Sequence, residues 1–263
     1  MKYEITPVEL IHLLTENGMY EPQDNEQYLA DYEKENNLTI PGCLREFMSA
    51  AYMHPLLRTA DVWARKEGPE WFFLYEEIQE MLDEDLEEYL EDEESDYHIF
   101  AKTPRERWGE LVPDYLNIGS DYAAGVVSYG IREDDLGAEN PPVYMQHEAD
   151  PYTQWNMLFE SVSDYLLYVI CDALLGVFYD TAQNVMEKYN WKFKSYKYNT
   201  LEDAADLFKK YDIDPSRLCK IRTTYPEDWQ SERIVCGQKD LVIVIKLENS
   251  EVEAVVISKE SAK

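Results

Sequence analysis

The chain has 263 residues, of which 24 are Lys or Arg and 54 are Asp or Glu, so its formal charge at pH 7 is −30. This balance excludes a protein that binds nucleic acid or an anionic membrane over its whole surface, because both tasks require cations placed against phosphates. The hydrophobic fraction of 45% and the aromatic fraction of 13% are those of a globular chain, so we expect a folded protein with an acidic surface.

Two further features concern the compartment. No stretch approaches the roughly 18 consecutive apolar residues of a membrane helix, and the first residues lack the apolar core of a signal peptide. We therefore expect a cytoplasmic protein without a membrane partner. The four cysteines form no Cys-x-x-Cys pair, and in a cytosolic chain we expect free, mostly buried thiols. They are Cys43, Cys171, Cys219 and Cys236.

The first part of the chain predicts helices. Thr6, Pro7 and Glu9 have the pattern of a helix start, with a Thr-x-x-Glu capping box around a proline at the first helical position. Residues 24–35 predict a second, weaker helix. Residues 38–48 change at a proline from extended chain to a helix whose apolar residues face inward.

The most acidic segment runs from Glu76 to Asp96, where 13 of 21 residues are acidic and none is Lys or Arg. Its apolar residues keep helical spacing, so we expect an amphipathic helix whose other face is solvated carboxylate. The carboxylates expected to be most exposed, and therefore the candidate partner-binding residues, are Glu84, Asp85, Glu87, Glu88, Glu91, Asp92, Glu93 and Glu94.

The middle of the chain predicts a sheet. Residues 111–118, 125–132 and 142–148 are short, rich in Val, Tyr and Ile, and separated by turn-forming residues, which is typical of an antiparallel meander. Ser161 then caps a helix that extends to Leu174 with a broad apolar face, and we expect this helix to cover the sheet.

After Asn190 the composition changes. Residues 200–211 predict a short helix, and residues 219–225, 240–247 and 252–258 predict strands, the last two joined as a hairpin.

The charge divides the chain. Residues 191–263 hold 13 basic and 13 acidic residues, whereas residues 1–190 hold 11 basic and 41 acidic residues, and 11 − 41 equals the full −30. We therefore predict an acidic domain over 1–190 and a charge-neutral extension over 191–263, which could continue the same sheet.

No set of residues indicates catalysis. The four histidines lie in separate segments without zinc-ligand spacing, and no nucleophile elbow, phosphate loop or dinucleotide-binding glycine pattern is present. Acidic pairs are abundant only because acidic residues are abundant, so a choice of general acid and base would be arbitrary. We expect no enzyme, no metal and no cofactor. What remains is a binding protein whose anionic surface would attract a basic partner.

Four segments, in order, resemble the SUKH superfamily. Ile40-Pro41 with Leu44 and Phe47 is similar to the Leu-Pro-x-x-hydrophobic-x-x-Phe helix start of that family, and residues 115–121 to its strand ending in Ile-Gly-x-x-Gly. Residues 142–148 resemble its Pro-Val-Tyr strand. Ser161-Val162-Ser163-Asp164-Tyr165-Leu166 resembles its closing Ser-Phe-x-x-Phe-Leu helix. The likeness covers roughly residues 25–176, and the extension has no counterpart.

The resemblance implies an α+β fold in which helices flank a mostly antiparallel sheet. It also implies a role, because many bacterial members are immunity proteins that neutralise a cognate toxin, often a nuclease or deaminase, while eukaryotic relatives are regulatory interaction proteins. Toxin contacts are not fixed by the motifs of the family, so none is transferred to this chain.

These observations together predict a non-enzymatic immunity protein that binds a basic toxin through the acidic face of residues 1–190. Two alternatives stay open, namely a regulatory scaffold without a toxin partner and an enzyme with a carboxylate-based site. The oligomeric state is not predicted.

Overall fold

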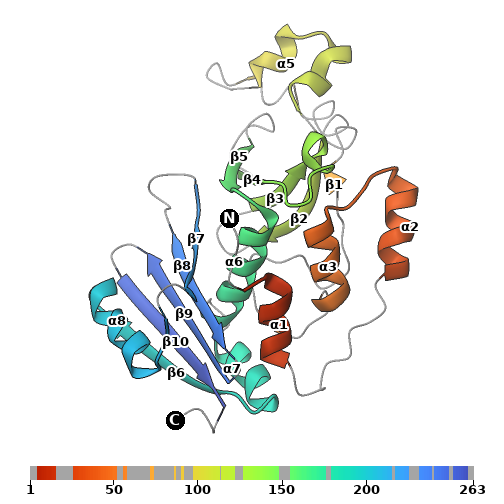
Figure 1. Cartoon of the computed structure of the whole chain (residues 1–263). Coiled ribbons are helices and arrows are strands. Elements are labelled where there is room, and N and C mark those ends of the chain that lie inside the picture. The colour runs from red at the N-terminus through yellow and green to blue at the C-terminus, as the bar shows by residue number, and fades with distance from the viewer. Residues whose placement is uncertain are drawn as a thin grey trace.

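Two antiparallel β-sheets, with helices around and between them, make up the computed structural model of the chain (Figure 1). The α+β fold class is therefore confirmed. The structure describes residues 5–15, 26–51, 56–57, 72–73, 86, 90–91, 97–112, 114–121, 127–147, 155–175, 179–214, 217–224, 231–238, 240–248 and 251–259. Within these residues, no helix is long and apolar enough to cross a membrane.

The described helices are α1 (Pro7–Thr15), α2 (Glu26–Asn36), α3 (Gly42–Ala51), α5 (His98–Lys102), α6 (Val162–Leu175), α7 (Tyr179–Lys188) and α8 (Leu201–Lys210), with the 3-10 helices η2 (Arg105–Glu110) and η3 (Glu133–Asp135). The first sheet has the order β1 (Phe72–Phe73), β2 (Tyr115–Asp121), β3 (Val127–Arg132), β4 (Val143–His147) and β5 (Asn156–Phe159). The second sheet has the order β6 (Lys192–Tyr198), β10 (Glu251–Ser258), β9 (Leu241–Glu248), β8 (Glu232–Gln238) and β7 (Cys219–Arg222).

The first sheet contains the expected meander, with one boundary corrected. β2 begins at Tyr115, whereas the sequence analysis began the strand at Leu111. Leu111 packs instead against a small separate core that includes the buried Val112. The pairing of β2 with β3 shifts between Asn117 and Gly119, which is the irregularity of a β-bulge.

The strands after Trp191 form their own sheet and do not extend the first one. The predicted hairpin is confirmed, because Glu248 of β9 lies opposite Glu251 of β10. The two sheets are joined at their edges, where the backbone N–H of Thr224 after β7 donates to the carbonyl oxygen of Leu158 in β5 at 2.8 Å.

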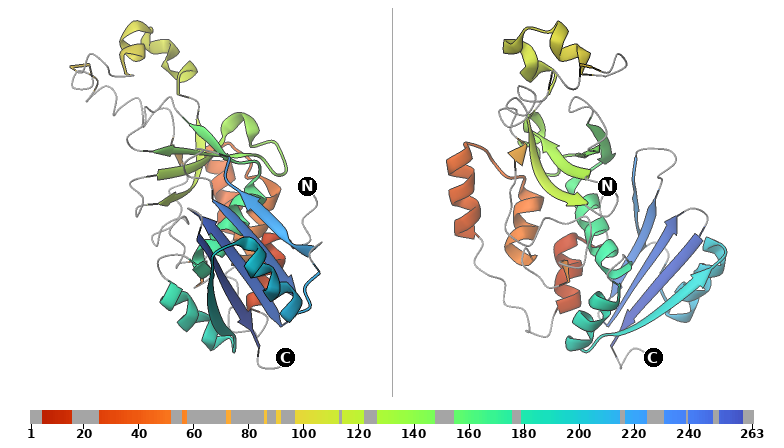
Figure 2. Two further views of the ribbon diagram at one scale, coloured as in Figure 1. Left: turned by 90° about the vertical axis from the view of Figure 1, so that its left-hand side faces the viewer. Right: turned by 180° about the vertical axis from the view of Figure 1, so that it is seen from behind.

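Helix α6 lies between the two sheets, rather than over one of them as expected (Figures 1 and 2). Ten of its 14 residues are buried, so it is covered on nearly all sides, as a central helix must be. It contacts β5 of the first sheet and β7 to β10 of the second. The main core consequently includes buried residues from both predicted parts of the chain, such as Val143, Leu166 and Val244.

The first turn of α6 shows how sequence and tertiary structure together satisfy a helix end. A helix leaves its first backbone N–H groups without partners inside the helix. Here the N–H of Val162 donates to the carbonyl oxygen of Pro141 at 2.7 Å, and the N–H of Asp164 donates to Oγ of Ser161 at 3.1 Å. The N–H between them, that of Ser163, donates to Oδ1 of Asn140 at 2.9 Å.

The capping box of α1 is confirmed. The N–H of Thr6 donates to Oε2 of Glu9 at 2.7 Å, and the N–H of Glu9 donates to Oγ1 of Thr6 at 3.1 Å. Thr200 caps α8 with the second of these two bonds, because its Oγ1 accepts from the N–H of Asp203 at 3.1 Å. These local contacts account for the success of the sequence analysis at these two helix starts.

Three helices end at a non-glycine residue in the left-handed conformation. The residues are Asn37, Asn190 and Asp212, with φ of 53°, 62° and 53°. Short polar side chains tolerate this conformation better than others do. After Asn190, the N–H of Trp191 donates to the carbonyl oxygen of Met186 at 3.1 Å, which closes α7 and directs the chain into β6.

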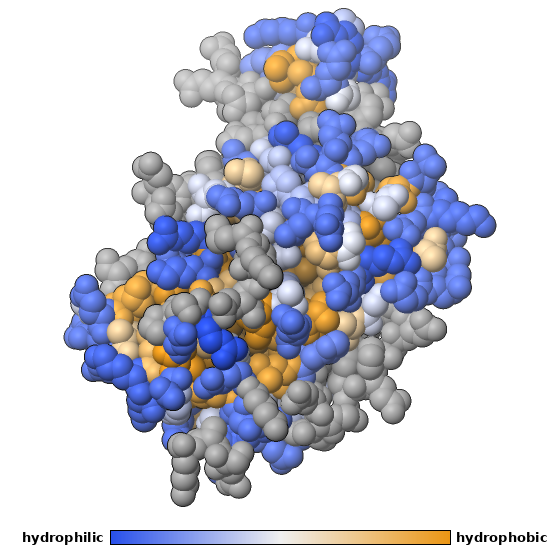
Figure 3. All heavy atoms as spheres, in the orientation of Figure 1, coloured by the Kyte–Doolittle hydropathy of each residue, from blue (hydrophilic) through white to orange (hydrophobic). Residues whose placement is uncertain are grey.

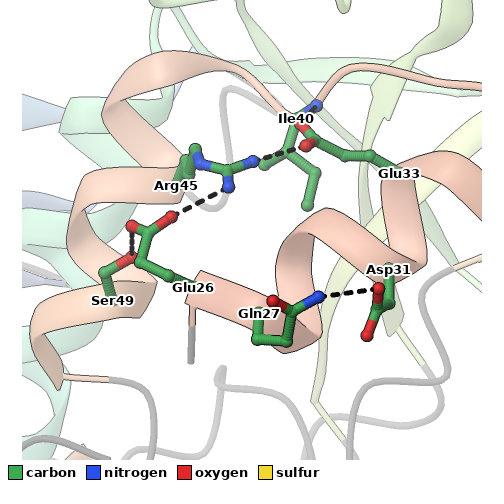
Figure 4. A network of polar contacts seen from close by, with 7 residues as sticks. All are labelled: Glu26, Gln27, Asp31, Glu33, Ile40, Arg45 and Ser49. Carbon is green, nitrogen blue, oxygen red and sulfur yellow. Dashed lines mark hydrogen bonds and ion pairs between the residues drawn. The ribbon is translucent and has the colours of Figure 1, made fainter. Parts of the chain in front are cut away.

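An ion-pair network joins α2 to α3 (Figure 4). Arg45 forms ion pairs with Glu33 and with Glu26, the latter at 2.8 Å between Nη2 and Oε2. Glu26 also accepts a hydrogen bond from Ser49, and Glu33 accepts one from the N–H of Ile40 at 2.8 Å. The network fixes the segment between the two helices, where the family-like Ile-Pro pair lies.

Candidate partner-binding site

The structure describes part of the acidic segment chosen from the sequence. Glu91 is exposed, as predicted. The N–H of Leu90 donates to the carbonyl oxygen of Leu86 at 3.0 Å, which is the spacing of an α-helical turn. The other candidate residues lie outside the described residues; they are Glu84, Asp85, Glu87, Glu88, Asp92, Glu93 and Glu94.

Leu86 connects this acidic segment to a small hydrophobic core that is separate from the main one. The core consists of the buried residues Phe100, Trp108 and Val112, and Leu86 is half-buried against it. The rings of Phe100 and Trp108 meet edge to face, with centroids 5.3 Å apart and planes at 78°. We call residues 86, 90–91 and 97–112 the acidic lobe, after the acidic segment that it joins; these residues themselves hold three acidic and three basic side chains.

Trp108 holds the acidic lobe together through polar contacts as well. Its indole Nε1–H lies 3.1 Å from the carbonyl oxygens of both Phe100 and Thr103, so it bridges the end of α5. The hydroxyl of Thr103 donates to the carbonyl oxygen of Ile99 at 2.8 Å. The tryptophan thus links η2 to α5, and with them the acidic segment around Leu86.

The surface of the acidic lobe combines charge with an exposed apolar side chain. Ile99 is 43% exposed, and Figure 3 shows a small apolar area among hydrophilic residues at this end of the molecule. Arg107 forms an ion pair with Glu110 at 2.6 Å, and hydrogen bonding from Arg107 lowers the pKa of the Glu110 carboxyl. Both views in Figure 2 show α5 standing apart from the two sheets.

A second candidate surface, which the sequence analysis missed, lies on the first sheet. Arg132 donates from Nε to the hydroxyl of Tyr115 at 3.0 Å, and its guanidinium lies 4.4 Å from the ring centre of Tyr144. Trp155 stacks on Tyr115 with ring centroids 3.9 Å apart. The hydroxyl of Tyr144 donates to Asp135 at 3.4 Å. We call these five residues the aromatic face.

The aromatic face has the composition of a protein-interaction surface. Trp, Tyr and Arg are the residue types that dominate binding energy at protein interfaces. Tyr115 and Trp155 are buried, with 2% and 7% exposure, so among these residue types a partner could touch only the half-buried Arg132 and Tyr144. Burial raises the pKa of the Tyr115 hydroxyl. Met157, which lies opposite Tyr144 in the strand pairing, is 43% exposed. The alternation of side chains along each strand could have indicated this surface, but only once the register of the strands was known.

The described residues offer no cluster of three or more His, Cys, Asp or Glu side chains that could hold a metal ion. The four cysteines are free thiols, of which Cys43 is half-buried and the others are buried, as predicted. Burial raises the pKa of Cys43 to about 11 and that of Cys219 to about 12, so neither thiol is a thiolate nucleophile at neutral pH.

The described part of residues 1–190 also carries exposed carboxylates away from the acidic lobe. Glu133 and Asp134 lie on η3 next to the aromatic face, and Glu35 and Glu46 lie on α2 and α3. A basic partner would therefore meet carboxylates on several elements of this part of the molecule.

Comparisons of the chain with protein-family models, with curated proteins and with solved structures give no significant match.

Proposed function

We propose that the chain is a non-enzymatic immunity protein that binds and neutralises a basic toxin domain, with a nuclease or another nucleic-acid-acting toxin as the best candidate. The observation that carries this proposal is the location of the charge. Residues 1–190 hold 11 basic and 41 acidic residues, and residues 191–263 hold 13 of each, so the whole −30 belongs to the first part. Such a surface accelerates association with a basic protein.

The acidic lobe is the proposed docking site. Leu86 attaches the acidic segment to the core around Trp108, so at least this point of the segment has a fixed place. Carboxylates can stand in for phosphates in the cationic groove of a nuclease. Glu91 and Ile99 are exposed on the same lobe, which gives a partner both a charge and an apolar contact.

The arrangement of the four family-like segments supports the SUKH part of the proposal. Leu44 and Phe47 of α3, Ile118 of β2, Val143 of β4 and Leu166 of α6 are all buried in the main core. The first helix start, the two strands and the closing helix thus pack together. This is the arrangement expected if the segments are the motifs of one domain.

The direct test is neutralisation. The gene next to that of this chain is inspected for a long protein with a variable C-terminal domain, and that domain is expressed in a sensitive host with and without this chain. The proposal predicts restored growth and a stable complex of the two proteins. A complex without any change in toxicity would favour the regulatory scaffold, and hydrolysis or transfer on a small-molecule substrate by the purified chain would favour an enzyme.

A further inference from the structure

Strand β6 is an edge of the second sheet. It pairs with β10 on one side, and none of the described strands pairs with its other side. Lys192, Lys194, Ser195 and Lys197 of this strand are exposed. An edge strand of seven residues presents a row of backbone groups to which another strand can pair.

The sequence of β6 is complementary to itself about its central residue. If two copies pair antiparallel with Ser195 opposite Ser195, then Lys194 lies opposite Tyr196, Phe193 opposite Lys197, and Lys192 opposite Tyr198. Every lysine then faces an aromatic ring of the other copy, and no lysine faces a lysine. Lysines on an edge strand usually prevent pairing, but a lysine above the face of an aromatic ring forms a favourable cation–π contact. For this contact Lys197 would exchange its ion pair with Glu253, now at 2.8 Å, for the ring of Phe193.

The two faces of the sheet also agree with this pairing. Tyr196 and Tyr198 pack against the core beneath α8, whereas Phe193 packs against the main core on the opposite face. A two-fold axis through Ser195, perpendicular to the sheet, places the α8-covered face of one copy on the same side as the α8-covered face of the other. The two faces then form one continuous surface of the joined sheet. A lysine–tyrosine cation–π contact already occurs within one chain, because Nζ of Lys210 lies 5.5 Å from the ring centre of Tyr196.

The charge distribution favours this edge over other surfaces for self-association. Two molecules of charge −30 repel each other, and the repulsion is weakest where their neutral parts meet. Strand β6 belongs to the neutral residues 191–263. It lies at the opposite end of the molecule from α5 and the acidic lobe (Figures 1 and 2).

We propose that the chain forms a two-fold dimer through β6, in which two five-stranded sheets join into one continuous antiparallel sheet. The partner is a second copy of this chain. The dimer interface lies at the opposite end of each molecule from its acidic lobe, and the dimer is independent of the immunity function proposed above.

Cross-linking at the two-fold axis tests the pairing. The substitution Ser195→Cys places two thiols directly opposite each other, with Cβ atoms roughly 4.5–5.5 Å apart, which is close enough for a disulfide after small adjustment. Lys192→Cys is the matched control, because its two introduced thiols would be separated by six strand positions, or about 20 Å. We expect rapid oxidation of the Ser195→Cys protein to a covalent dimer on a non-reducing gel, and no such dimer from the control or the wild type.

Sedimentation equilibrium gives a second, independent readout. The wild type should be dimeric, with tighter association as salt screens the −30 charge, and Ser195→Lys should raise the dimer Kd roughly fivefold by placing like charges opposite each other. Because Ser195 is exposed, the circular dichroism of this variant should be unchanged. A wild type that stays monomeric at all salt concentrations, with equal cross-linking of the two cysteine variants, would overturn the proposal.

Discussion

Oδ1 of Asn140 accepts a hydrogen bond from the backbone N–H of Ser163 at 2.9 Å. The same oxygen lies 3.2 Å from the hydroxyl of Ser163 and 3.3 Å from Sγ of Cys43, the second residue of α3. One side chain in the turn before β4 therefore connects the starts of α3 and α6. The first and the fourth of the segments that resemble the SUKH motifs meet at this point, two residues before the third.

Replacement of Asn140 should loosen this junction. Asn140→Ala removes the acceptor for the α6 N–H and should lower the free energy of unfolding by about 1 kcal/mol, the usual cost of losing a cap. Asn140→Asp keeps the acceptor and places a negative charge at a helix start, so it should be close to the wild type at neutral pH. Urea denaturation of the three proteins provides the comparison. Equal stability of Asn140→Ala and the wild type would show that the contact contributes nothing.

The close packing behind the aromatic face depends on Gly130. A Cβ at this position would lie 3.0 Å from Cζ3 of Trp155 and 3.3 Å from the carbonyl oxygen of Leu116. Because an indole ring and a backbone atom cannot easily move, Gly130→Ala should cost about 1–3 kcal/mol of unfolding free energy. Gly137→Ala is the matched control, since nothing lies within 4 Å of its Cβ position. Thermal denaturation measures the melting temperature of each variant. Equal melting temperatures for Gly130→Ala and Gly137→Ala would contradict the close packing around Gly130.

The acidic lobe should unfold separately from the main core. Trp108→Ala removes the centre of its small core and both indole hydrogen bonds. We expect faster hydrogen exchange at the N–H groups of Leu111 and Val112, which donate to the Trp108 carbonyl oxygen at 2.9 and 3.1 Å. Exchange in β8, β9 and β10 should stay unchanged. Uniform acceleration over the whole chain would instead mean that the lobe and the main core unfold as one unit.

The network between α2 and α3 should give a measurable pH dependence. Hydrogen bonding from Ser49, and then from Arg45, lowers the pKa of Glu26 in the folded chain. A lowered folded-state pKa means that this contribution to stability is present above the unfolded pKa and is lost as the pH falls through the folded pKa. The stability difference between the wild type and Glu26→Gln should therefore shrink as the pH falls below 4.5, the ordinary pKa of a glutamate.

Ser49→Ala is the control for this pH effect, because it removes the largest cause of the shift. In that background the stability difference caused by Glu26→Gln should depend less on pH. Urea denaturation at each pH measures both differences. A difference that stays constant over the whole range would contradict a lowered pKa for Glu26.

Local signals in the sequence predicted local structure well. The starts of α1, α6 and α8 follow from Thr6, Ser161 and Thr200, because a capping side chain and the N–H that it accepts are only a few residues apart. β6 and β8 were missed, because a lysine-rich edge strand and a strand beginning Glu232-Arg233 lack the apolar alternation of a typical strand. Helix α7 was missed as well.

Nonlocal relationships could not be predicted. The position of α6 between two sheets depends on a second sheet whose strands come later in the chain. The composition identified the acidic segment, but the contact of Leu86 with the core around Trp108 joins residues 22 positions apart. The aromatic face needs the register of β2, β3 and β4, which individual strands do not determine.

The rate of toxin association tests the central claim most directly. In one variant, Glu84, Glu87, Glu88 and Glu91 are changed to Lys, and in a matched variant the same change is made at the exposed Glu202, Asp203, Asp206 and Glu251 of the extension. Each change from a carboxylate to Lys raises the net charge by two, so either set of four raises it by eight and both variants have a formal charge of −30 + 8, or −22. Stopped-flow measurements at low salt should show association slowed roughly tenfold or more by the first set, with a weaker salt dependence, and little changed by the second. Equal rates for the two variants would contradict docking through the acidic segment of residues 76–96 and the lobe that it joins.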